Sequence, residues 1–544
     1  MKSKKRRVWI LCIILTVLTT TILNVIRPQL TMAATENHPF YDISDSFAEE
    51  AILRLYKQGI VSGTSAHYYE PNKVLTRAEY SALVVRALQL QPVENDLSPF
   101  TDMSKKAWYY GDVNALVNLD LVKGRSLNQF EPQSTVKREE AAVMMIRMLK
   151  IDLSDELSSS KLSYSDQDKI SSWARSSVAK VTELGFMQGN GNYFHPKQSL
   201  TRGEAAVLLD RILQTSNVKS ALQMKPNDKV QMGWQYASTT AEYEEQVLSS
   251  DVNTLSPRWF FLDANNMIRS NVDKRLINFA KDNSIPIWPL VGNRFNADLT
   301  HQLLSDPAKR ESLVQKLVNE ASSYGLAGLN IDFENVQSSD REYVNAFITS
   351  LYSKLKTKGI LLSIDVSPDL GTDWTEAFDY KTLGKNADYI VLMAYDEHWN
   401  GSSNPGSVSS LPWLESGVRK LMKVVNKDKI IVALPTYTRD WSLSDPVNGT
   451  NDISMHRQGQ IYRSNQQNLK WDSSVSQYTL TYTNSGVRRK IWTEDSRSLS
   501  AKVRLLEKLN LAGYAYWHMG SETSDIWTAI DNVRTYEAYK FKFN

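Results

Sequence analysis

A threefold internal repeat limits what residues 40–204 can fold into. Each copy opens on an aromatic residue with Asp two positions later, and continues through a glycine turn and an aromatic-x-Pro step to a helix start rich in Arg and Glu. The copies open at Phe40, Phe100 and Tyr164, which are 60 and 64 residues apart. One copy is too small to bury a core of its own, so we expect the three to pack together as one unit.

The residues of one copy predict two short helices. Glu49–Tyr56 has apolar residues at helical spacing, and the glycine turn that follows ends this helix. The second helix begins at a Thr with Glu three residues later, at Thr76 and again at Thr201, which is the pattern of a capping box. The middle copy has Lys137 at this position and Glu139 where the first copy has Ala, so we expect its cap to differ.

The three copies, at about residues 38–90, 98–150 and 162–215, resemble the S-layer homology (SLH) family. The resemblance implies a mostly helical unit that binds pyruvylated secondary polymers of bacterial cell walls. It also implies that the Arg after each helix cap and the early Asp of each copy line grooves between copies, where a guanidinium suits a carboxylate on a sugar. The alternative is that each Arg only pairs with an acid of its own copy. The residues concerned are Arg77, Arg138, Arg202, Asp42, Asp102 and Asp166.

Residues 1–34 have the pattern of a signal peptide. A basic start precedes an apolar run over Val8–Val25, and Ala33 and Ala34 offer a cleavage site. The alternative is an uncleaved membrane anchor, because the apolar run approaches the length of a span. Cleavage would remove six Lys and Arg, taking the net charge from +3 to −3, and would remove Cys12, the only Cys. We therefore expect a secreted protein without disulfides, attached to a bacterial cell wall.

From residue 229 to residue 544, short apolar runs alternate with helical stretches. Eight such runs predict an α/β fold, a (β/α)8 TIM barrel, with its chemistry at the carboxyl ends of the strands. Residues 216–228 are predicted to be a linker, and Asn451–Arg497 a small α+β insertion between strands seven and eight. The strand candidates are Val230–Tyr236, Arg258–Leu262, Ile285–Val291, Gly328–Phe333, Ile360–Ser367, Tyr389–Tyr395, Ile430–Pro435 and Gly513–Trp517.

The fourth strand candidate ends in an unusual set of polar residues. Alternation along the strand places Asn330, Asp332 and Glu334 on one face and apolar residues on the other. If the polar face points into the barrel, its carboxylates are costly unless they are paired or used. Two carboxylates close together also repel, which raises the pKa of one of them. A carboxyl that keeps its proton near neutral pH is what a general acid for glycoside cleavage needs.

The run Ala327–Glu334 resembles the Asp-Gly-x-Asp-x-Asp-x-Glu motif of glycoside hydrolase family 18, with Ala327 and Asn330 where the family commonly has Asp. The resemblance implies that Glu334 is the acid/base, that Asp332 orients the acetamido group of the substrate, and that Asn330 binds substrate. The sugar's own carbonyl then attacks the anomeric carbon, so configuration is retained without a second carboxylate nucleophile. The Asn-Ile-Asp-Phe-Glu-Asn form is similar to the branch of the family associated with spore and cell-wall peptidoglycan hydrolases.

Two further strand ends agree with this resemblance. The sixth strand ends in a segment that resembles the family's Met-x-Tyr-Asp, which implies that Tyr395 hydrogen-bonds the acetamido carbonyl and that Asp396 helps to hold the sugar. Trp517, at the end of the eighth strand, resembles the family's platform under the cleaved sugar, since an indole face stacks on sugar CH groups. Glu397 and Trp399 are added as substrate-binding candidates.

Other residues carry less signal. His398 beside Glu397 is not expected to bind a metal, because the chain has 7 His and no His-x-x-x-His pair. No metal and no cofactor is predicted. Arg439 and Trp441, after strand seven, are placed on the rim as weaker substrate contacts. The barrel holds 11 of the 14 Trp, and four of them are expected to be structural: Trp259, Trp471, Trp492 and Trp527.

Together these patterns predict a cell-wall-anchored glycosidase that cuts β-1,4 bonds of N-acetylglucosamine-containing polymers, with peptidoglycan favoured and chitin as the other candidate. Two alternatives stay open: a non-catalytic carbohydrate-binding protein, and a purely structural surface-layer protein. The balance of 63 Lys and Arg against 60 Asp and Glu gives no reason to expect nucleic acid. The expected partners are the glycan substrate and a secondary wall polymer, with no stable protein partner.

Overall fold

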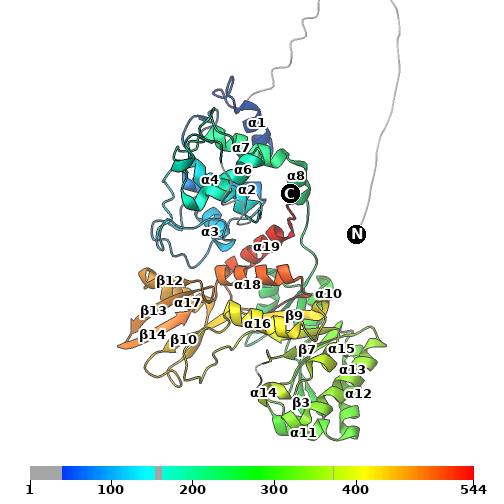
Figure 1. The fold of residues 1–544 in the computed structure, drawn as a ribbon. Coiled ribbons are helices and arrows are strands. Elements are labelled where there is room, and N and C mark those ends of the chain that lie inside the picture. The colour runs from blue at the N-terminus through cyan, green and yellow to red at the C-terminus, as the bar shows by residue number, and fades with distance from the viewer. Residues whose placement is uncertain (1–38, 154–161, 370, 372, 544) are drawn as a thin grey trace, which may run out of the picture.

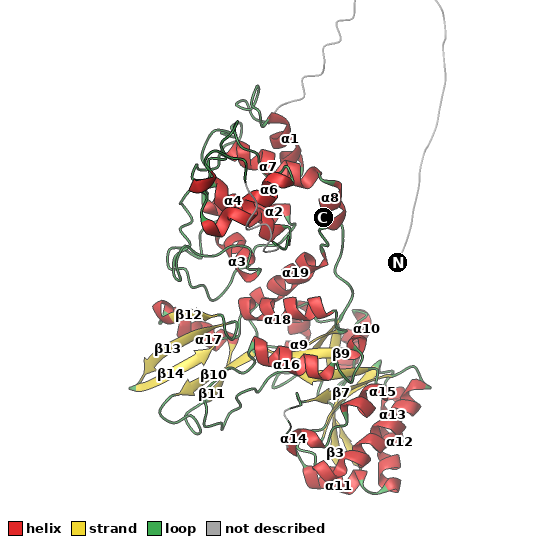
Figure 2. Cartoon of the chain, in the orientation of Figure 1, coloured by secondary structure: helices red, strands yellow, loops and turns green. Residues whose placement is uncertain are grey.

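The computed structural model describes residues 39–153, 162–369, 371 and 373–543, and the expected signal peptide lies outside them. The three copies form a helical unit, and the rest of the chain forms a barrel with a second, small sheet at its side (Figures 1 and 2). The fold class predicted from the sequence is confirmed. No helix within these described ranges is long and apolar enough to cross a bilayer.

The helical unit closes into a ring of three copies. The first helix of each copy packs on the second helix of the copy before it, and the first copy packs on the last. At the centre, three backbone hydrogen bonds form a triangle: Leu75 N to Leu200 O, Leu200 N to Val136 O, and Val136 N to Leu75 O, at 2.8, 2.8 and 3.1 Å. The helices are α1 Glu49–Lys57, α2 Arg77–Ala87, α3 Tyr110–Asn118, α4 Arg138–Met148, α6 Arg175–Glu183 and α7 Arg202–Gln214.

The middle copy departs from its neighbours at the start of its second helix. Thr76 and Thr201 make the predicted capping boxes. Lys137 has no side-chain oxygen to accept a bond, yet its backbone N–H still donates to Glu140 at 2.8 Å, so half of the box is kept. Glu139 is buried and accepts three hydrogen bonds from the third copy, which ties the two copies together.

Parallel strands close into a barrel whose second strand is formed by β2 and β3. The strand β1 pairs with β2 on one side and β15 on the other, and the ring closes where Leu255 bridges Ile287. A further strand, β4 Met267–Ser270, forms an antiparallel hairpin with β3. The barrel strands are β1 Val230–Trp234, β2 Thr254–Ser256, β3 Phe260–Asp263, β5 Leu290–Gly292, β6 Gly328–Asp332, β7 Leu361–Val366, β8 Tyr389–Met393, β9 Ile430–Pro435 and β15 Gly513–Trp517.

Helices cover the outside of the barrel and the insertion flanks it (Figure 2). The helices of the barrel are α9 Thr240–Leu248, α10 Lys274–Asp282, α11 Ala297–Leu304, α12 Pro307–Ser323, α13 Arg341–Lys356, α14 Asp373–Glu376, α15 Tyr380–Lys385, α16 Leu411–Leu421, α18 Ser496–Leu509 and α19 Asp525–Ala538. The insertion contains β10 Tyr437–Ser442, β11 Asn451–Ser454, α17 Met455–Arg463, β12 Leu469–Asp472, β13 Gln477–Asn484 and β14 Val487–Trp492.

Prolines explain where two strands differ from the prediction. The candidate Arg258–Leu262 is regular only as β3, and a short strand that was not predicted, β2, precedes it on the other side of Pro257. The candidate Ile285–Val291 is regular only as β5, because Pro286 and Pro289 have no N–H to give to the ladder.

Two boundaries also differ from the prediction. Residues 216–228, expected to be a linker, begin with a helix, α8 Ser216–Ala221, before an irregular stretch. The insertion sheet begins at Tyr437, directly after β9, and not at Asn451. The earlier start places β10 next to the carboxyl end of a barrel strand.

The helical unit contacts the barrel through α3, α18 and α19 (Figure 1). Asn532 exchanges two hydrogen bonds with the backbone of Gln91, at 2.8 and 2.7 Å. Lys150 pairs with Glu537 at 3.2 Å. These bonds fix the direction in which the barrel faces relative to the helical unit.

A buried ion pair fastens the insertion to the barrel. Lys502 of α18 and Glu494, which follows β14, are both fully buried and paired with each other. Glu494 also accepts hydrogen bonds from Gln477 and Ser498, at 2.7 and 2.8 Å. This pair therefore helps to position the whole insertion sheet.

The variant Lys502→Met should destabilise the protein by about 3–5 kcal/mol, because it leaves the charge of Glu494 buried without its partner. Urea unfolding followed by tryptophan fluorescence measures the loss. The double variant Lys502→Met/Glu494→Gln is the control and should recover most of the stability. A single variant as stable as the wild type would contradict this role of the ion pair.

Candidate active site

The end of β6 follows the predicted alternation. Phe333 points outward and stacks on Phe347 of α13, with 5.6 Å between ring centroids. Asn330, Asp332 and Glu334 face the inside of the barrel. Since β6 pairs in parallel with β5 and β7, its carboxyl end lies beside theirs.

Asn330 lies beneath the site and not on its surface. It is fully buried, its Oδ1 accepts a hydrogen bond from Trp234 Nε1 at 2.9 Å, and its Nδ2 donates to Asp365 at 2.7 Å. A side chain with no exposed surface cannot touch substrate, so the predicted substrate contact is corrected to a supporting role. Asp365 is not among the site residues that the sequence predicts. Its signal was the register of β7, which sets Ser363 beside Asn330 and Asp365 next on the same face.

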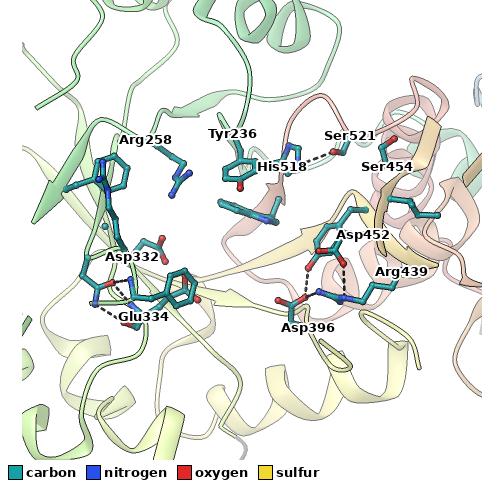
Figure 3. A pocket seen from close by; sticks show the side chains of 18 residues that line it. Tyr236, Arg258, Asp332, Glu334, Asp396, Arg439, Asp452, Ser454, His518 and Ser521 are labelled. Carbon is teal, nitrogen blue, oxygen red and sulfur yellow. Dashed lines mark hydrogen bonds and ion pairs between the residues drawn. The ribbon is translucent and has the colours of Figure 1, made fainter. Parts of the chain in front are cut away.

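Two adjoining hollows lie at this end of the barrel, and Figure 3 shows the side chains that line the outer one. The outer one is a cleft of about 940 Å³ and the inner one a chamber of about 110 Å³. A water molecule takes ~30 Å³, so the chamber has room for a few heavy atoms, the size of a sugar substituent and not of a ring. Both hollows are lined by Phe295, Asp332, Glu334, Asp396 and Trp517, and the chamber also by Trp234, Asp365, Met393 and Tyr395.

Carboxyl groups gathered in this small space raise one another's pKa. Burial, and then the charges of Asp332 and Asp396, raise the pKa of Glu334 to about 8. Burial also raises the pKa of Asp332, and the positive charge of Arg258 opposes both shifts. Burial and the charge of Asp332 raise the pKa of Asp365. Glu334 is therefore a carboxyl that holds a proton at neutral pH.

Tyr395 keeps its hydroxyl proton in the chamber. Burial, and then the charges of Glu334 and Asp332, raise the pKa of Tyr395 well above its ordinary value. Its ring lies nearly parallel to that of Trp517, at 22° and with 6.4 Å between centroids. A neutral phenol can donate a hydrogen bond to a carbonyl oxygen.

Trp517 forms the centre of an aromatic wall. Its ring centroid lies 5.3 Å from that of Tyr236 and 5.7 Å from that of Trp234. A flat aromatic face beside an acid suits the apolar side of a sugar ring. The tryptophans predicted to be structural lie elsewhere: Trp259 and Trp527 are buried, and Trp471 and Trp492 lie under Arg497 and Lys490.

The insertion contributes a second polar group (Figure 3). Asp396, after β8, accepts hydrogen bonds from the Tyr437 hydroxyl and from Arg439 Nη2, the latter at 2.8 Å. Arg439 also pairs with Asp452 at 3.0 Å and donates to the carbonyl of His398 at 2.8 Å. Tyr437 and Asp452 are not among the predicted site residues, because their positions depend on the antiparallel pairing of β10 with β11.

Three residues that were predicted to contact the substrate line neither the cleft nor the chamber. Glu397 accepts hydrogen bonds from the backbone N–H and the hydroxyl of Ser410 at the start of α16, at 2.7 and 3.0 Å. Trp399 is 57% exposed and lines neither hollow. Trp441 is buried, with its Nε1 donating to Gly406 O at 2.8 Å, so it belongs to the core and not to the rim.

The arginines of the helical unit reach across the boundaries between copies. Arg77 lies over the ring of Phe130, at 4.5 Å, and donates to the carbonyl of Phe130 at 2.9 Å. Arg138 and Arg202 make the equivalent contacts with the third and first copies. They also approach the capping Glu of those copies, at 3.3 and 3.8 Å, so these ion pairs do not stay within one copy as the alternative supposed.

The early Asp of each copy holds a turn. Asp42, Asp102 and Asp166 each accept two backbone N–H bonds, at 2.7 to 3.0 Å. These carboxylates thus fix the backbone just before the Pro of their own copy, and whether they also line a groove stays a prediction. The boundary between the second and third copies contains a hollow of about 160 Å³, whose polar lining includes Arg138, Gln188, Glu204 and Arg211.

Glu334 should titrate near pH 8, and its neighbours should move this value in opposite directions. Asp332→Asn removes a negative charge and should lower the pKa of Glu334, whereas Arg258→Gln removes a positive charge and should raise it. Carboxyl ¹³C NMR across the pH range measures each value. Glu415→Gln, on the surface of α16, is the control. Titration of Glu334 at the ordinary value of 4.5 would contradict this electrostatic arrangement.

Comparison with known proteins finds one family for the barrel and another for the helical unit. The family model of glycosyl hydrolases family 18 matches residues 213–522, and that of the S-layer homology domain matches residues 39–81, 99–142 and 163–206. The uncharacterized glycosylase YvbX of Bacillus subtilis (strain 168) is 25% identical over 296 residues, which cover 51% of this chain and 84% of that protein.

A second relative and a solved structure match the same half. The cortical fragment-lytic enzyme of Bacillus subtilis (strain 168) is 28% identical over 253 residues, 45% of this chain, and the chain spans only 58% of that relative's length. The chitinase from Chromobacterium violaceum ATCC 12472 superposes with a TM-score of 0.52 at 25% identity, covering 56% of this chain and 99% of that one. Since the first family model matches more than half of the residues, the chain belongs to glycosyl hydrolases family 18 and carries three S-layer homology domains ahead of this glycosidase barrel.

Proposed function

We propose that this glycosidase is secreted, is held at the cell wall, and cleaves β-1,4 bonds in polymers that contain N-acetylglucosamine, with peptidoglycan favoured over chitin. The chamber beside Glu334 carries the proposal. There a carboxyl with a raised pKa, a neutral Tyr395 hydroxyl and the face of Trp517 surround a space the size of an acetamido group.

The reaction begins with the sugar ring on Trp517 and its acetamido group in the chamber. Glu334 gives its proton to the glycosidic oxygen, which leaves with the bonding electron pair. The acetamido carbonyl oxygen attacks the anomeric carbon from the opposite side and forms an oxazolinium ring. Glu334, now a carboxylate, takes a proton from a water molecule that opens this ring. Two inversions at the same carbon retain its configuration.

The neighbours of Glu334 orient the acetamido group. Asp332 accepts its N–H, which aims the carbonyl at the anomeric carbon, and Tyr395 donates to that carbonyl. Asp365 and Asn330 support Asp332 from behind, through the hydrogen bond between them. Asp396, held by Tyr437 and Arg439, contacts the sugar hydroxyls from the other side of the cleft.

The anchor favours a wall polymer as the substrate. S-layer homology domains indicate attachment to the cell surface or wall, which keeps the barrel next to peptidoglycan. The names of the relatives point to both substrates, one to cortical fragments and one to chitin. We further propose that Arg77, Arg138 and Arg202 bind pyruvyl carboxylates of a secondary wall polymer in the grooves between copies.

Glu334→Gln should lower the release of reducing sugar from purified peptidoglycan by about 10²–10⁴-fold, because the variant cannot donate a proton. Chitin digested side by side, with mass analysis of the products, identifies the preferred substrate. Glu415→Gln, a partly exposed glutamate of α16 that pairs with Arg419 and lines neither hollow, is the matched control and should keep full activity. Wild-type protein that releases no more sugar than Glu334→Gln would favour the non-catalytic carbohydrate-binding protein.

Binding to isolated cell walls should depend on the pyruvyl groups and on the groove arginines. The full chain should sediment with untreated walls and stay in solution with walls stripped of pyruvate by mild acid. Arg202→Ala should weaken the binding, and circular dichroism checks that the variant is folded. Equal binding to both kinds of wall would rule out the pyruvyl carboxylate as the ligand.

A further inference from the structure

Three arginines line the outer cleft, and two of them are unpaired. Arg439 is balanced by Asp396 and Asp452. In the part of the chain that the structure describes, Arg258 and Arg294 make neither a hydrogen bond nor an ion pair, and Arg258 Nε is buried without a partner. Figure 3 shows Arg258 on the side of the cleft away from Asp396 and Arg439. The arginine at one end of the cleft is therefore ion-paired, and the two other arginines are not.

Aromatic rings hold the two unpaired guanidinium groups. The guanidinium carbon of Arg258 lies 5.4 Å from the ring centre of Phe261 and 5.0 Å from that of Tyr236, and that of Arg294 lies 4.2 Å from Phe261. Contact with a ring face orients a guanidinium but uses none of its N–H donors. Both groups are thus held at the cleft with donors to spare.

The loop that carries Arg294 is fastened to the end of β6. Asn293 Nδ2 donates to Glu334 O at 2.7 Å, and Glu334 N donates to Asn293 Oδ1 at 3.0 Å. Arg294 and Phe295 both have positive φ, 53° and 59°, which costs free energy for residues with a Cβ. A strained loop tied to the backbone of Glu334 keeps the backbone of Arg294 at a fixed place in the wall of the outer cleft.

A carboxylate is the ligand that fits two such groups. Guanidinium forks bind carboxylates through paired, charge-assisted hydrogen bonds, and neutral sugar hydroxyls offer no negative charge to pair with them. The negative charge of Asp332 accounts for Arg258, which lowers the pKa of Asp332 and Glu334. It does not account for Arg294, whose exposed side chain lines the outer cleft and is not among the charges that shift either pKa.

We propose that Arg258 and Arg294 form a subsite for a carboxylate carried on the polymer next to the sugar that is cleaved. This inference rests on the proposed function and sharpens it: the substrate is an acidic amino-sugar polymer, such as one bearing lactyl ethers or a short peptide, and not neutral chitin. The carboxylate comes either from the lactyl group or from the attached peptide.

The test compares four soluble substrates of equal length. They are peptidoglycan strands stripped of peptide with free lactyl carboxylates, the same strands with those carboxylates converted to methyl amides, strands that keep their peptides, and chitin oligosaccharides. The wild type should cleave a carboxylate-bearing strand with a kcat/KM about tenfold above that for the methyl amide, the size of one charge-assisted hydrogen bond. In Arg258→Gln/Arg294→Gln this ratio should fall to about one. Because Arg258 also lowers the pKa of Glu334, each protein is assayed at its own pH optimum, and the ratio between substrates is compared instead of the absolute rate.

The control is Arg275→Gln, an exposed arginine of α10, which should keep the wild-type ratio. Preference for the stripped strands identifies the lactyl carboxylate, and preference for peptide-bearing strands identifies the peptide. A double variant that loses the same factor on every substrate, or a wild type that cleaves all substrates equally well, would overturn the subsite.

A binding experiment separates the carboxylate subsite from the proposed function. It measures the equilibrium binding of the same strands to Glu334→Gln protein. A carboxylate preference in binding supports the subsite even if the wild type cleaves nothing, which would refute the proposed function alone.

Discussion

Carboxyl groups crowded into a space with little water are the constraint on which the active site depends. Burial and mutual repulsion raise the pKa of Asp332, Glu334 and Asp365 together, because the parallel strands β6 and β7 bring their carboxyl ends to one point. One proton must stay on such a cluster near neutral pH. The polar neighbours follow from this constraint: Asn330 donates to Asp365, and Arg258 offsets part of the charge.

The barrel packs directly against the helical unit, so the connecting segment after α8 does not let the two parts move independently. The copies of the helical unit close on one another through arginines that reach across each boundary, so no copy is independent. The ring then packs on α18 and α19, the last helices of the barrel. Attachment of the ring to a wall polymer would therefore fix the direction of the cleft as well as its distance from the wall.

Much of this arrangement follows from local patterns in the sequence. The alternation of β6 and the capping boxes at Thr76 and Thr201 depend on residues close together in the chain, and both are confirmed in the structure. Trp517 lines both hollows, and its role as a sugar platform stays a prediction. Asp365 needs the register between neighbouring strands, and Asp452 needs the pairing of β10 with β11. Glu397 shows the converse: although it follows the Met-x-Tyr-Asp segment directly, its carboxylate accepts its hydrogen bonds from Ser410, 13 residues later. Local sequence thus predicts Glu334 as the candidate acid, and strand pairing decides which polar neighbours lie near it.

The configuration of the first product tests the proposed mechanism most directly. In that mechanism the acetamido group of the substrate is the nucleophile, and the chamber beside Glu334 and Tyr395 holds it in place. ¹H NMR during the first minutes of cleavage of a soluble, N-acetylglucosamine-containing strand shows which anomer is released before mutarotation. The mechanism predicts the β-anomer, with the configuration of the cleaved bond retained. Initial release of the α-anomer would contradict it.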